Sequence, residues 1–422
     1  MEKLPECEQE ERVEKGEWRA RIPEVGEALV QVSEKGFDED ENSLNGTERF
    51  EGSGSKLIKG DEDDCSFFEG AEKLLEIWFD KKAGNDLRDI PRCDWESVLS
   101  YVHCLIISHI SSADHDAYVL SESSMFISRQ RFILKTCGKT TLLLALRPLL
   151  SLVYSYCQNT PQSLFYSRKS YLQPNHQPLP HGSFSREADF LLSLFPDGRS
   201  YCMGDVNRDC WYLFKVERLG TIGSPFLDPS CPGLTVEPDQ TLEVLMSNLE
   251  PEAMQPFFQS DGITAQDVTK KTGIANLLPG SSIDAVLFSP CGYSLNGLTS
   301  QGYYWTIHVT PEAKFSYASF ETNLELCPRG VESSLADDAE EKVTLEGLLN
   351  QLLQIFRPQK LITTLFANST SKCHMVIRHM VPPGPASPPG YHVTGRQWAQ
   401  FSLYSLLFLS LESDNRPQAI EL

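Results

Sequence analysis

The stretch Tyr118-Val-Leu-Ser-Glu-Ser-Ser-Met-Phe-Ile127 combines the spacing of a strand with a cluster of hydroxyls around one glutamate. Tyr118, Leu120 and Glu122 alternate with Val119 and Ser121, and the next apolar residues follow at once, which predicts a short strand. Taken alone, three serines around a glutamate are consistent with nothing more than a solvated strand end.

The wording Leu120-Ser-Glu-Ser-Ser-Met-Phe126 resembles the self-processing site of the eukaryotic S-adenosylmethionine decarboxylases. In that family the backbone breaks before the serine that follows the glutamate, and this serine becomes a pyruvoyl group. The resemblance therefore implies cleavage between Glu122 and Ser123, with Ser123 as a catalytic residue and as the source of a covalent pyruvoyl cofactor.

The chemistry explains why a serine is needed at this point. Its hydroxyl can attack the preceding carbonyl and convert the amide into an ester, which opens when the serine α-proton is removed. Elimination and hydrolysis then leave a ketone at the new N-terminus. A substrate amine condenses with this ketone to a Schiff base, which accepts the electrons released when the substrate carboxylate leaves as carbon dioxide.

Length, composition and charge indicate a folded chain with an acidic extension. The 422 residues, 41% of them hydrophobic, suffice for one large core or two modest ones. The net charge of -21 argues against a general nucleic-acid binder, because neutralising phosphates requires clustered lysine and arginine. Residues 1–66 hold 20 acidic and 9 basic side chains. Residues 1–60 show little hydrophobic periodicity, which predicts a disordered, acidic N-terminal extension.

The chain shows no sign of secretion, membrane insertion or metal binding. Its first residues contain no apolar run, and its most apolar stretch, residues 401–411, is shorter than the roughly twenty residues that a spanning helix needs. The 12 cysteines show no Cys-x-x-Cys spacing and fit reduced thiols. We therefore predict a cytoplasmic protein without a membrane span or a metal site.

Residues 67–79 begin like a strand and continue with a helical period. We predict a helix whose buried stripe contains Ala71, Leu74, Leu75 and Trp78. The pattern alone would place the glutamates on a solvated face. However, Phe67-Phe-Glu-Gly-Ala-Glu-Lys73 closely resembles a family segment in which the second phenylalanine binds substrate and both glutamates assist activity. The resemblance implies these roles for Phe68, Glu69 and Glu72.

A second strand is predicted over Arg131-Phe-Ile-Leu-Lys-Thr-Cys-Gly138, followed by an apolar helix over residues 142–150. A lone cysteine at a strand end usually packs in a core. Leu134-Lys-Thr-Cys-Gly138 nevertheless resembles the family pattern, which implies that Cys137 is the proton donor of catalysis. Lys139 departs from the Gly-Thr-Thr sequence that the family tends to have here.

Two more strands are predicted further along the chain. Residues 285–297 form a strand broken at Pro290 and Gly292, and residues 304–312 alternate so that His308 shares a face with two threonines. A strand histidine among threonines is more often structural. Opening the ester, however, needs a base that accepts a proton near neutral pH, as histidine does. The resemblance assigns that base to His308 and gives Ser294 the task of steadying the attack intermediate.

The same resemblance implies how the substrate is bound. Phe288 would pair with Phe68 around the substrate adenine, a stacking that suits a flat aromatic base. Glu312 would hold the ribose hydroxyls, and Glu122 would contribute to substrate binding as well as to processing.

The resemblance further implies a site for putrescine, which activates animal members of the family. A dication needs carboxylates to offset its desolvation. The matching residues are Asp239, Thr241, Glu243 and Glu321, with Phe165 and Phe366 as apolar walls. Asp239 would also serve as the N-cap of a helix that opens over residues 238–243. The family adds a tyrosine from its C-terminal sheet, for which we find no counterpart after His374, so we expect weaker stimulation than in a member with the full C-terminus.

The resemblance covers residues 67–372 and includes a predicted helix over residues 344–356 and a strand over residues 360–368. From about His374 the wording is foreign to the family. We therefore divide the chain into an extension (residues 1–60), a decarboxylase core cleaved between residues 122 and 123 (residues 61–372) and a divergent C-terminal segment (residues 373–422).

The implied fold is an α+β, four-layer αββα sandwich of two large antiparallel sheets with helices on the outer faces. The implied function is a pyruvoyl-dependent decarboxylation of S-adenosylmethionine that supplies the aminopropyl donor for spermidine and spermine, in a homodimer of processed two-chain protomers. One alternative is a catalytically weak paralogue that regulates an active decarboxylase, but such a protein would lose Ser123, His308 or Cys137. Another is an acidic interaction protein, which leaves the internal motifs unexplained.

Overall fold

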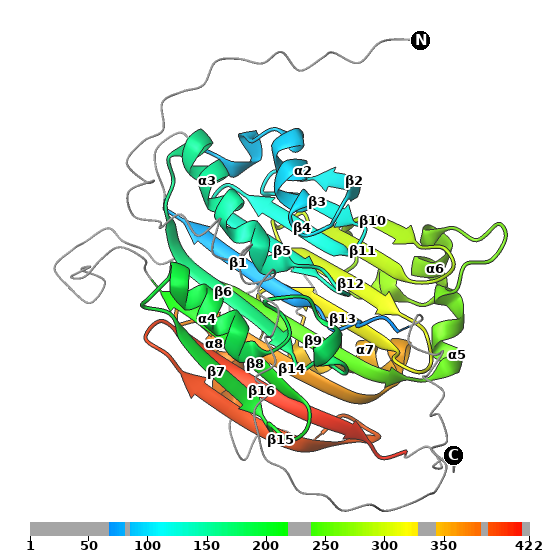
Figure 1. Cartoon of the computed structure of the whole chain (residues 1–422). Helices are drawn as coiled ribbons and strands as arrows, with labels where there is room; N and C mark the ends of the chain where they lie inside the picture. Colours follow the sequence, from blue (N-terminus) through cyan, green and yellow to red (C-terminus); the bar gives the residue numbers. More distant parts are fainter. Residues whose placement is uncertain (1–66, 81–84, 218–237, 328–342, 381–386, 416–422) are drawn as a thin grey trace, which may run out of the picture. The chain divides into compact units, whose positions relative to one another are not determined.

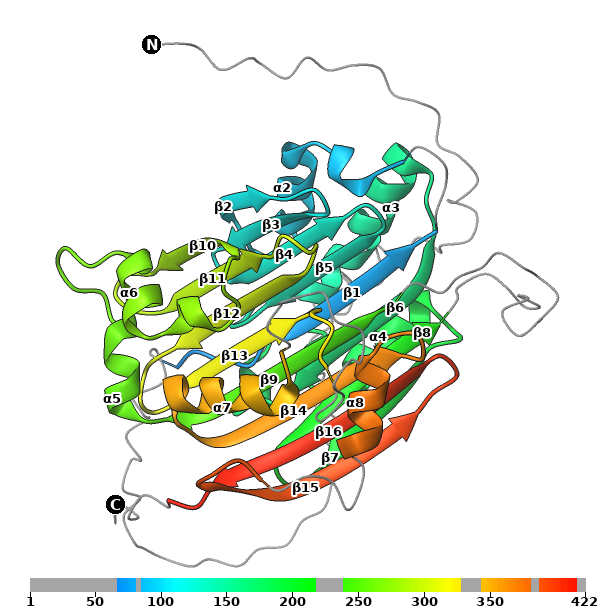
Figure 2. The same cartoon turned by 180° about the vertical axis from the view of Figure 1, so that it is seen from behind.

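The computed structural model describes residues 67–80, 85–217, 238–327, 343–380 and 387–415. In this part of the chain, two eight-stranded antiparallel sheets lie face to face and α-helices cover their outer faces (Figures 1 and 2). The predicted αββα sandwich is confirmed. The predicted N-terminal extension lies outside the described residues.

The first sheet has the strand order β2-β3-β4-β5-β1-β6-β8-β7. Its strands are β1 (Lys73–Phe79), β2 (Ile106–Ser111), β3 (His115–Leu120), β4 (Ser123–Ser128), β5 (Arg131–Thr136), β6 (Pro161–Lys169), β7 (Arg199–Gly204) and β8 (Cys210–Glu217). Helices α2 (Arg92–Ser100), α3 (Leu146–Cys157) and α4 (Phe184–Leu194) lie on its outer face (Figure 1). Trp95, Leu149 and Leu191 of these helices share one apolar core with the sheet.

The second sheet has the order β10-β11-β12-β13-β9-β14-β16-β15. Its strands are β9 (Gln240–Leu249), β10 (Ser282–Leu287), β11 (Tyr293–Leu298), β12 (Tyr304–Thr310), β13 (Tyr317–Thr322), β14 (Pro358–Asn368), β15 (Tyr391–Gln400) and β16 (Tyr404–Ser413). Helices α5 (Pro251–Met254), α6 (Ala265–Lys271), α7 (Leu345–Phe356) and α8 (Cys373–Met380) lie on its outer face (Figure 2).

The two sheets repeat a single topology. Raising every strand number of the first sheet by 8 gives the strand order of the second. Strands β15 and β16 therefore take the places that β7 and β8 take in the first sheet. The C-terminal segment, which the sequence pattern separated from the core, completes the second sheet.

Strand β1 shows that the helix predicted over residues 67–79 is wrong. Its side chains alternate between two apolar layers, with Leu75 and Ile77 under the outer helices and Leu74 facing the other sheet. A central strand that is buried on both faces lacks the polar alternation of a half-exposed strand. Its apolar run therefore mimics the stripe of a buried helix.

The helix predicted to open over residues 238–243, with Asp239 as its N-cap, is also wrong. Strand β9 begins at Gln240 and lies between β13 and β14. Leu242 and Val244 pack in the outer core of the second sheet. Asp239 is consequently no N-cap.

The single strand predicted over residues 118–127 is wrong, because β3 and β4 are separate antiparallel strands joined by a turn at residues 121 and 122. Strands β5, β12 and β14, and helices α3 and α7, overlap the residues for which strand or helix was predicted. The strand predicted over residues 285–297 is broken into β10 and β11, as expected from Pro290 and Gly292. Among the described residues, no helix has both the length and the apolar character that a membrane crossing requires.

Candidate active site

The bond predicted to break lies in a tight connection between neighbouring strands. Strand β3 ends at Leu120 and β4 begins at Ser123, so the bond follows the turn residue Glu122. Ser123 has a φ of +122°, a backbone conformation that costs a residue with a side chain on the order of 1–3 kcal/mol. Ser123 is only 2% exposed, and its hydroxyl has no hydrogen-bond partner among the described residues. Ser123, the residue predicted to react, thus combines a strained backbone with a buried hydroxyl that has no partner in the described part of the chain.

His308 lies on β12 directly opposite Ser294 of β11. The Ser294 Oγ is 2.9 Å from His308 Nδ1, and the Ser124 Oγ is 3.1 Å from His308 Nε2. Burial lowers the pKa of His308 well below its usual value, and the positive charge of Lys135 lowers it further. His308 is therefore a neutral imidazole near neutral pH and is able to accept a proton.

Cys137 follows the last residue of β5 and faces the turn before Ser123. Its backbone N–H donates to the Glu122 carbonyl at 3.2 Å, and its Sγ lies 3.6 Å from the same oxygen. Burial raises the pKa of the thiol well above its usual value, and the charges of Glu122 and Glu72 raise it further. The thiol is therefore protonated at neutral pH and holds a proton that it can donate.

These groups surround one cavity of about 240 Å³ between the two sheets. Phe68, from the segment before β1, and Phe288, directly after β10, both line it. Its wall also contains Glu312, whose Oε2 is buried without a partner in the described part of the chain. The predicted residues that line this cavity are Phe68, Glu122, Ser123, Cys137, Phe288, Ser294, His308 and Glu312.

The two glutamates of the first segment lie beside this cavity rather than in its wall. Tyr317 Oη donates to Glu72 Oε2 at 2.9 Å, and Ser319 Oγ donates to Glu72 Oε1 at 2.5 Å. Glu69 Oε2 accepts hydrogen bonds from the backbone N–H groups of Leu172 and Gln173 at 2.8 and 3.2 Å. Glu69 instead lines a neighbouring cavity of about 370 Å³, which shares Phe68 and Glu122 with the first. Burial raises the pKa of both carboxyls.

Three polar residues of the site were missed by the sequence prediction. Ser124 Oγ donates to Asn296 Oδ1 at 2.6 Å, and Thr306 Oγ1 lies 2.9 Å from His308 Nε2. The alternation of β12 already placed Thr306 on the face of His308, so that pattern could have found it. The sequence gives no such signal for Asn296, which depends on the packing of one sheet on the other.

The residues predicted to bind putrescine come together between the sheets. Lys135 Nζ donates to Glu321 Oε2 at 2.8 Å and lies 3.9 Å from Glu243 Oε1. Burial raises the pKa of Glu243 to about 7. A cavity of about 20 Å³ is lined by Thr241, Glu243, Phe165 and Phe366. Glu321 is fully buried beside it, as the alternation of β13 permitted.

Strand β16 supplies the tyrosine that the sequence analysis did not find. Tyr404 Oη donates to Asp239 Oδ2 at 2.7 Å, and its ring stacks on Phe366 with 4.4 Å between the ring centroids. Asp239 also lies 3.7 Å from Arg131 Nη1. The statement that no tyrosine after His374 reaches this site is therefore wrong. The pairing of β16 with β14 brings Tyr404 there. This pairing belongs to the repeated strand order of the sheets and leaves no local signal in the sequence.

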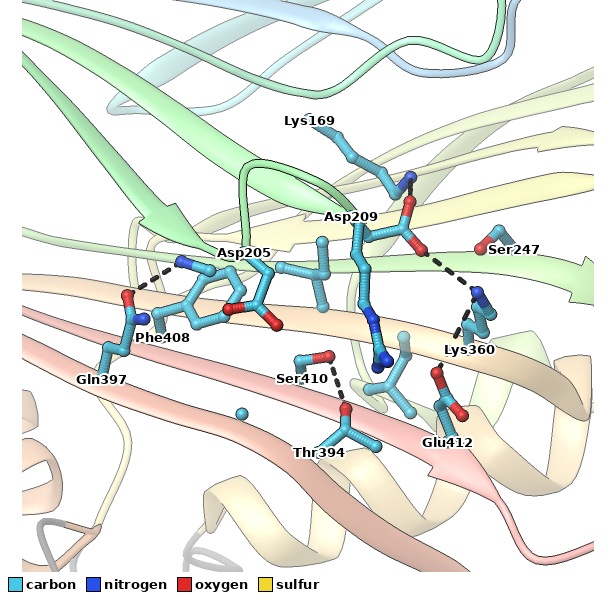
Figure 3. Close-up of a pocket in the computed structure, with 15 residues that line it drawn as sticks. Lys169, Asp205, Asp209, Ser247, Lys360, Thr394, Gln397, Phe408, Ser410 and Glu412 are labelled. Carbon is cyan, nitrogen blue, oxygen red and sulfur yellow. Dashed lines mark hydrogen bonds and ion pairs between the residues drawn. The ribbon is translucent and has the colours of Figure 1, made fainter.

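A further hollow of about 70 Å³ lies where the turn between β7 and β8 of the first sheet approaches β15 and β16 of the second (Figure 3). Figure 3 shows that four of its charged side chains pair with one another: Lys169 with Asp209, and Lys360 with Asp209 at 3.7 Å and with Glu412 at 4.0 Å. None of the predicted site residues, all of which the structure describes, lines it. We therefore assign the active site to the cavity around Ser123.

Comparison with known proteins decides the family. A family model described as adenosylmethionine decarboxylase matches residues 65–412. The chain belongs to the adenosylmethionine decarboxylase family. The match ends far beyond Lys372, so the prediction that the resemblance stops there is wrong.

Similar proteins support the adenosylmethionine decarboxylase assignment over most of the chain. The S-adenosylmethionine decarboxylase proenzyme of Xenopus laevis is 47% identical over 358 residues, which cover 84% of this chain and 97% of that protein. The proenzyme of Drosophila melanogaster is 44% identical, with 82% and 96% covered. The crystal structure of the Trypanosoma brucei AdoMetDC-delta26 monomer matches with a TM-score of 0.50 and 20% identity, covers 68% of this chain and 98% of that one, and supports the fold.

Proposed function

We propose that this decarboxylase cleaves itself between Glu122 and Ser123 and then converts S-adenosylmethionine to its decarboxylated form and carbon dioxide. The product would be the aminopropyl donor for spermidine and spermine synthesis. The observation that carries the proposal is the place of Ser123, strained, buried and without a hydroxyl partner in the described structure, in one cavity with Cys137 and His308.

The chain's own residues account for the processing steps. Ser123 Oγ attacks the Glu122 carbonyl, whose backbone lies next to the strained residue. Ser294 lines the cavity and steadies the charge that develops on the attacked carbonyl oxygen. His308, which burial keeps neutral, removes the α-proton of Ser123 and so opens the ester.

The same cavity accounts for turnover. The pyruvoyl group formed from Ser123 fits this position, because the buried hydroxyl has no competing partner in the described residues, and it would supply an electrophilic carbonyl that accepts electrons. Phe68 and Phe288 enclose the adenine, and the unpartnered Glu312 Oε2 accepts from a ribose hydroxyl. Cys137 gives its proton to the substrate carbon that has lost carbon dioxide.

Carbon dioxide release from carboxyl-labelled S-adenosylmethionine tests this function. We expect release by the wild-type chain and none by Ser123→Ala, which cannot form the pyruvoyl group. Ser128→Ala, at the other end of β4, is the matched control and retains activity. Release by Ser123→Ala at the wild-type rate would contradict the proposal.

We further propose that putrescine binds between the sheets at the cluster of Glu243, Glu321 and Asp239. Three buried carboxylates offset the desolvation of a dication. Lys135 connects this cluster to the active site, because its charge acts on the carboxyl of Glu72 and on His308 as well as on Glu321. The weaker stimulation by putrescine was expected only because we found no C-terminal tyrosine. Tyr404 supplies that tyrosine, so this reason no longer holds. The homodimer implied by the resemblance and the cytoplasmic location predicted from the sequence stay predictions.

The regulatory-paralogue alternative is less well supported. A weak paralogue needs no working site, whereas Ser123, Cys137, Ser294 and His308 surround one cavity here.

A further inference from the structure

Lys73 is a buried charge on β1 that the reaction described above does not use. Its side chain is 0% exposed. The ammonium donates to the Gly138 carbonyl at 3.1 Å and to Gln177 Oε1 at 3.4 Å. An amine held this far from water needs such acceptors, and one of them belongs to the residue directly after Cys137.

Gly138 is the residue through which Lys73 reaches the active site. Its φ is +62°, and a Cβ added to it would lie 2.8 Å from the Phe68 ring and 3.3 Å from Glu122 Oε2. Its N–H donates to the Glu69 carbonyl at 2.8 Å. Gly138 is therefore held at both its N–H and its carbonyl, in a turn that leaves no room for a side chain.

Lys73 also balances the charges that face the Cys137 thiol. Glu122, from the turn before β4, and Glu72, the residue directly before β1, both raise the pKa of the thiol that burial already raises, whereas Lys73 lowers it. Cys104 adds a further group that raises it. Burial lowers the pKa of Lys73 itself to about 8, although the nearby charges of Cys137 and Glu187 oppose this change. At neutral pH Lys73 is consequently still mostly protonated.

We propose that Lys73 is a positioning residue for proton delivery. Lys73 fixes Gly138 so that the Cys137 thiol points into the cavity. Its charge compensates those of Glu122 and Glu72 as the thiol gives up its proton. The inference rests on the proposed role of Cys137 as proton donor. Without this ammonium, the thiolate left after proton transfer would face two carboxylates and would lose the cation that acts on it most strongly.

The first test measures the thiol alone, in the unprocessed Ser123→Ala chain, so it does not depend on the pyruvoyl group. Iodoacetamide alkylation of the Cys137 peptide is followed by mass spectrometry as a function of pH. Lys73→Met and Lys73→Gln should shift the midpoint upward by about one pH unit, as expected for a unit charge at close range. Lys73→Arg, which keeps the charge, should leave the midpoint near that of Lys73. An unchanged midpoint in both uncharged variants would overturn the proposal.

The second test uses the processed enzyme and separates geometry from charge. Lys73→Met should lower kcat about tenfold while KM stays within about twofold, since the substrate walls Phe68 and Phe288 are untouched. Lys73→Gln keeps a donor for the Gly138 carbonyl and guards against a folding failure of Lys73→Met. A rise in KM with unchanged kcat in Lys73→Gln would assign Lys73 to substrate binding and overturn the inference. The thiol midpoint is measured in the Ser123→Ala chain and does not depend on processing. A midpoint shifted by the Lys73 variants would therefore leave the inference standing even if self-processing were disproved.

Discussion

At the scale of single residues, the environment of His308 fixes how processing depends on pH. Its pKa lies well below the usual value, chiefly because of burial, so the imidazole binds a proton only when the pH falls through this depressed pKa. We therefore expect a constant processing rate between about pH 6 and 8, measured by gel electrophoresis of freshly translated chain. A rate that halves near the pKa of an exposed histidine would contradict the assignment.

Removing this base should separate the two halves of processing. In His308→Ala, Ser123 still attacks the Glu122 carbonyl, but the ester has no base to open it. We expect an uncleaved chain that hydroxylamine, which opens esters, cuts at this bond. Thr306→Val, a substitution two residues away on the same strand, is the control. This variant should cleave itself without hydroxylamine, but more slowly than the wild-type chain. An uncleaved His308→Ala chain that resists hydroxylamine would give His308 another role.

The residues predicted to react lie around one cavity, whereas some of their polar neighbours were missed. Ser123, Cys137, Ser294 and His308 stand in motifs whose wording is specific to the family. Asn296 lies on the same strand as Ser294 but reaches Ser124 only because the two sheets face each other. Such contacts between distant strands leave no local pattern in the chain.

At the scale of elements, strand β16 gives the clearest prediction. Tyr404→Phe removes the hydroxyl that donates to Asp239 but keeps the ring that stacks on Phe366. Because Asp239 loses this donor, we expect half-maximal stimulation to need a several-fold higher putrescine concentration in Tyr404→Phe. Asp239→Asn should remove the response and spare basal turnover, measured as carbon dioxide release against putrescine concentration. Unchanged stimulation in Asp239→Asn would show that the site is wrongly placed.

The elements that sequence reasoning predicted correctly are those with a strict alternation of polar and apolar residues or a clear boundary. Helix α7 begins after Thr344, whose hydroxyl accepts from the N–H of Gly347, and β12 alternates in the way the pattern showed. Strands β1 and β9 lie in the middle of their sheets and are buried on both faces. The apolar run of β1 was misread as the stripe of a buried helix, and Asp239, just before β9, was misread as an N-cap. The C-terminal strands were missed because their place depends on the strand order that the two sheets share, and the two sheets do not share a recognisable sequence pattern.

At the scale of the whole molecule, the site needs only one part of the chain. Every residue assigned to processing, turnover or putrescine binding lies between Phe68 and Tyr404, within the unit Cys65–Leu422. Deleting residues 1–60 should therefore leave processing and turnover within about twofold of the full chain, measured by gel and by carbon dioxide release. A large loss of turnover would show that the acidic extension contributes to the site.

Self-cleavage at Ser123 is the central claim, and the intact mass of the purified protein tests it most directly. Self-cleavage with conversion of Ser123 to a pyruvoyl group should give two chains. The first ends at Glu122, and the second is lighter by one ammonia than a chain that begins with an unmodified Ser123. Ser123→Ala, treated identically, should give one chain of full length. A wild-type protein that stays a single chain, or whose second chain begins with an unmodified serine, would contradict the account.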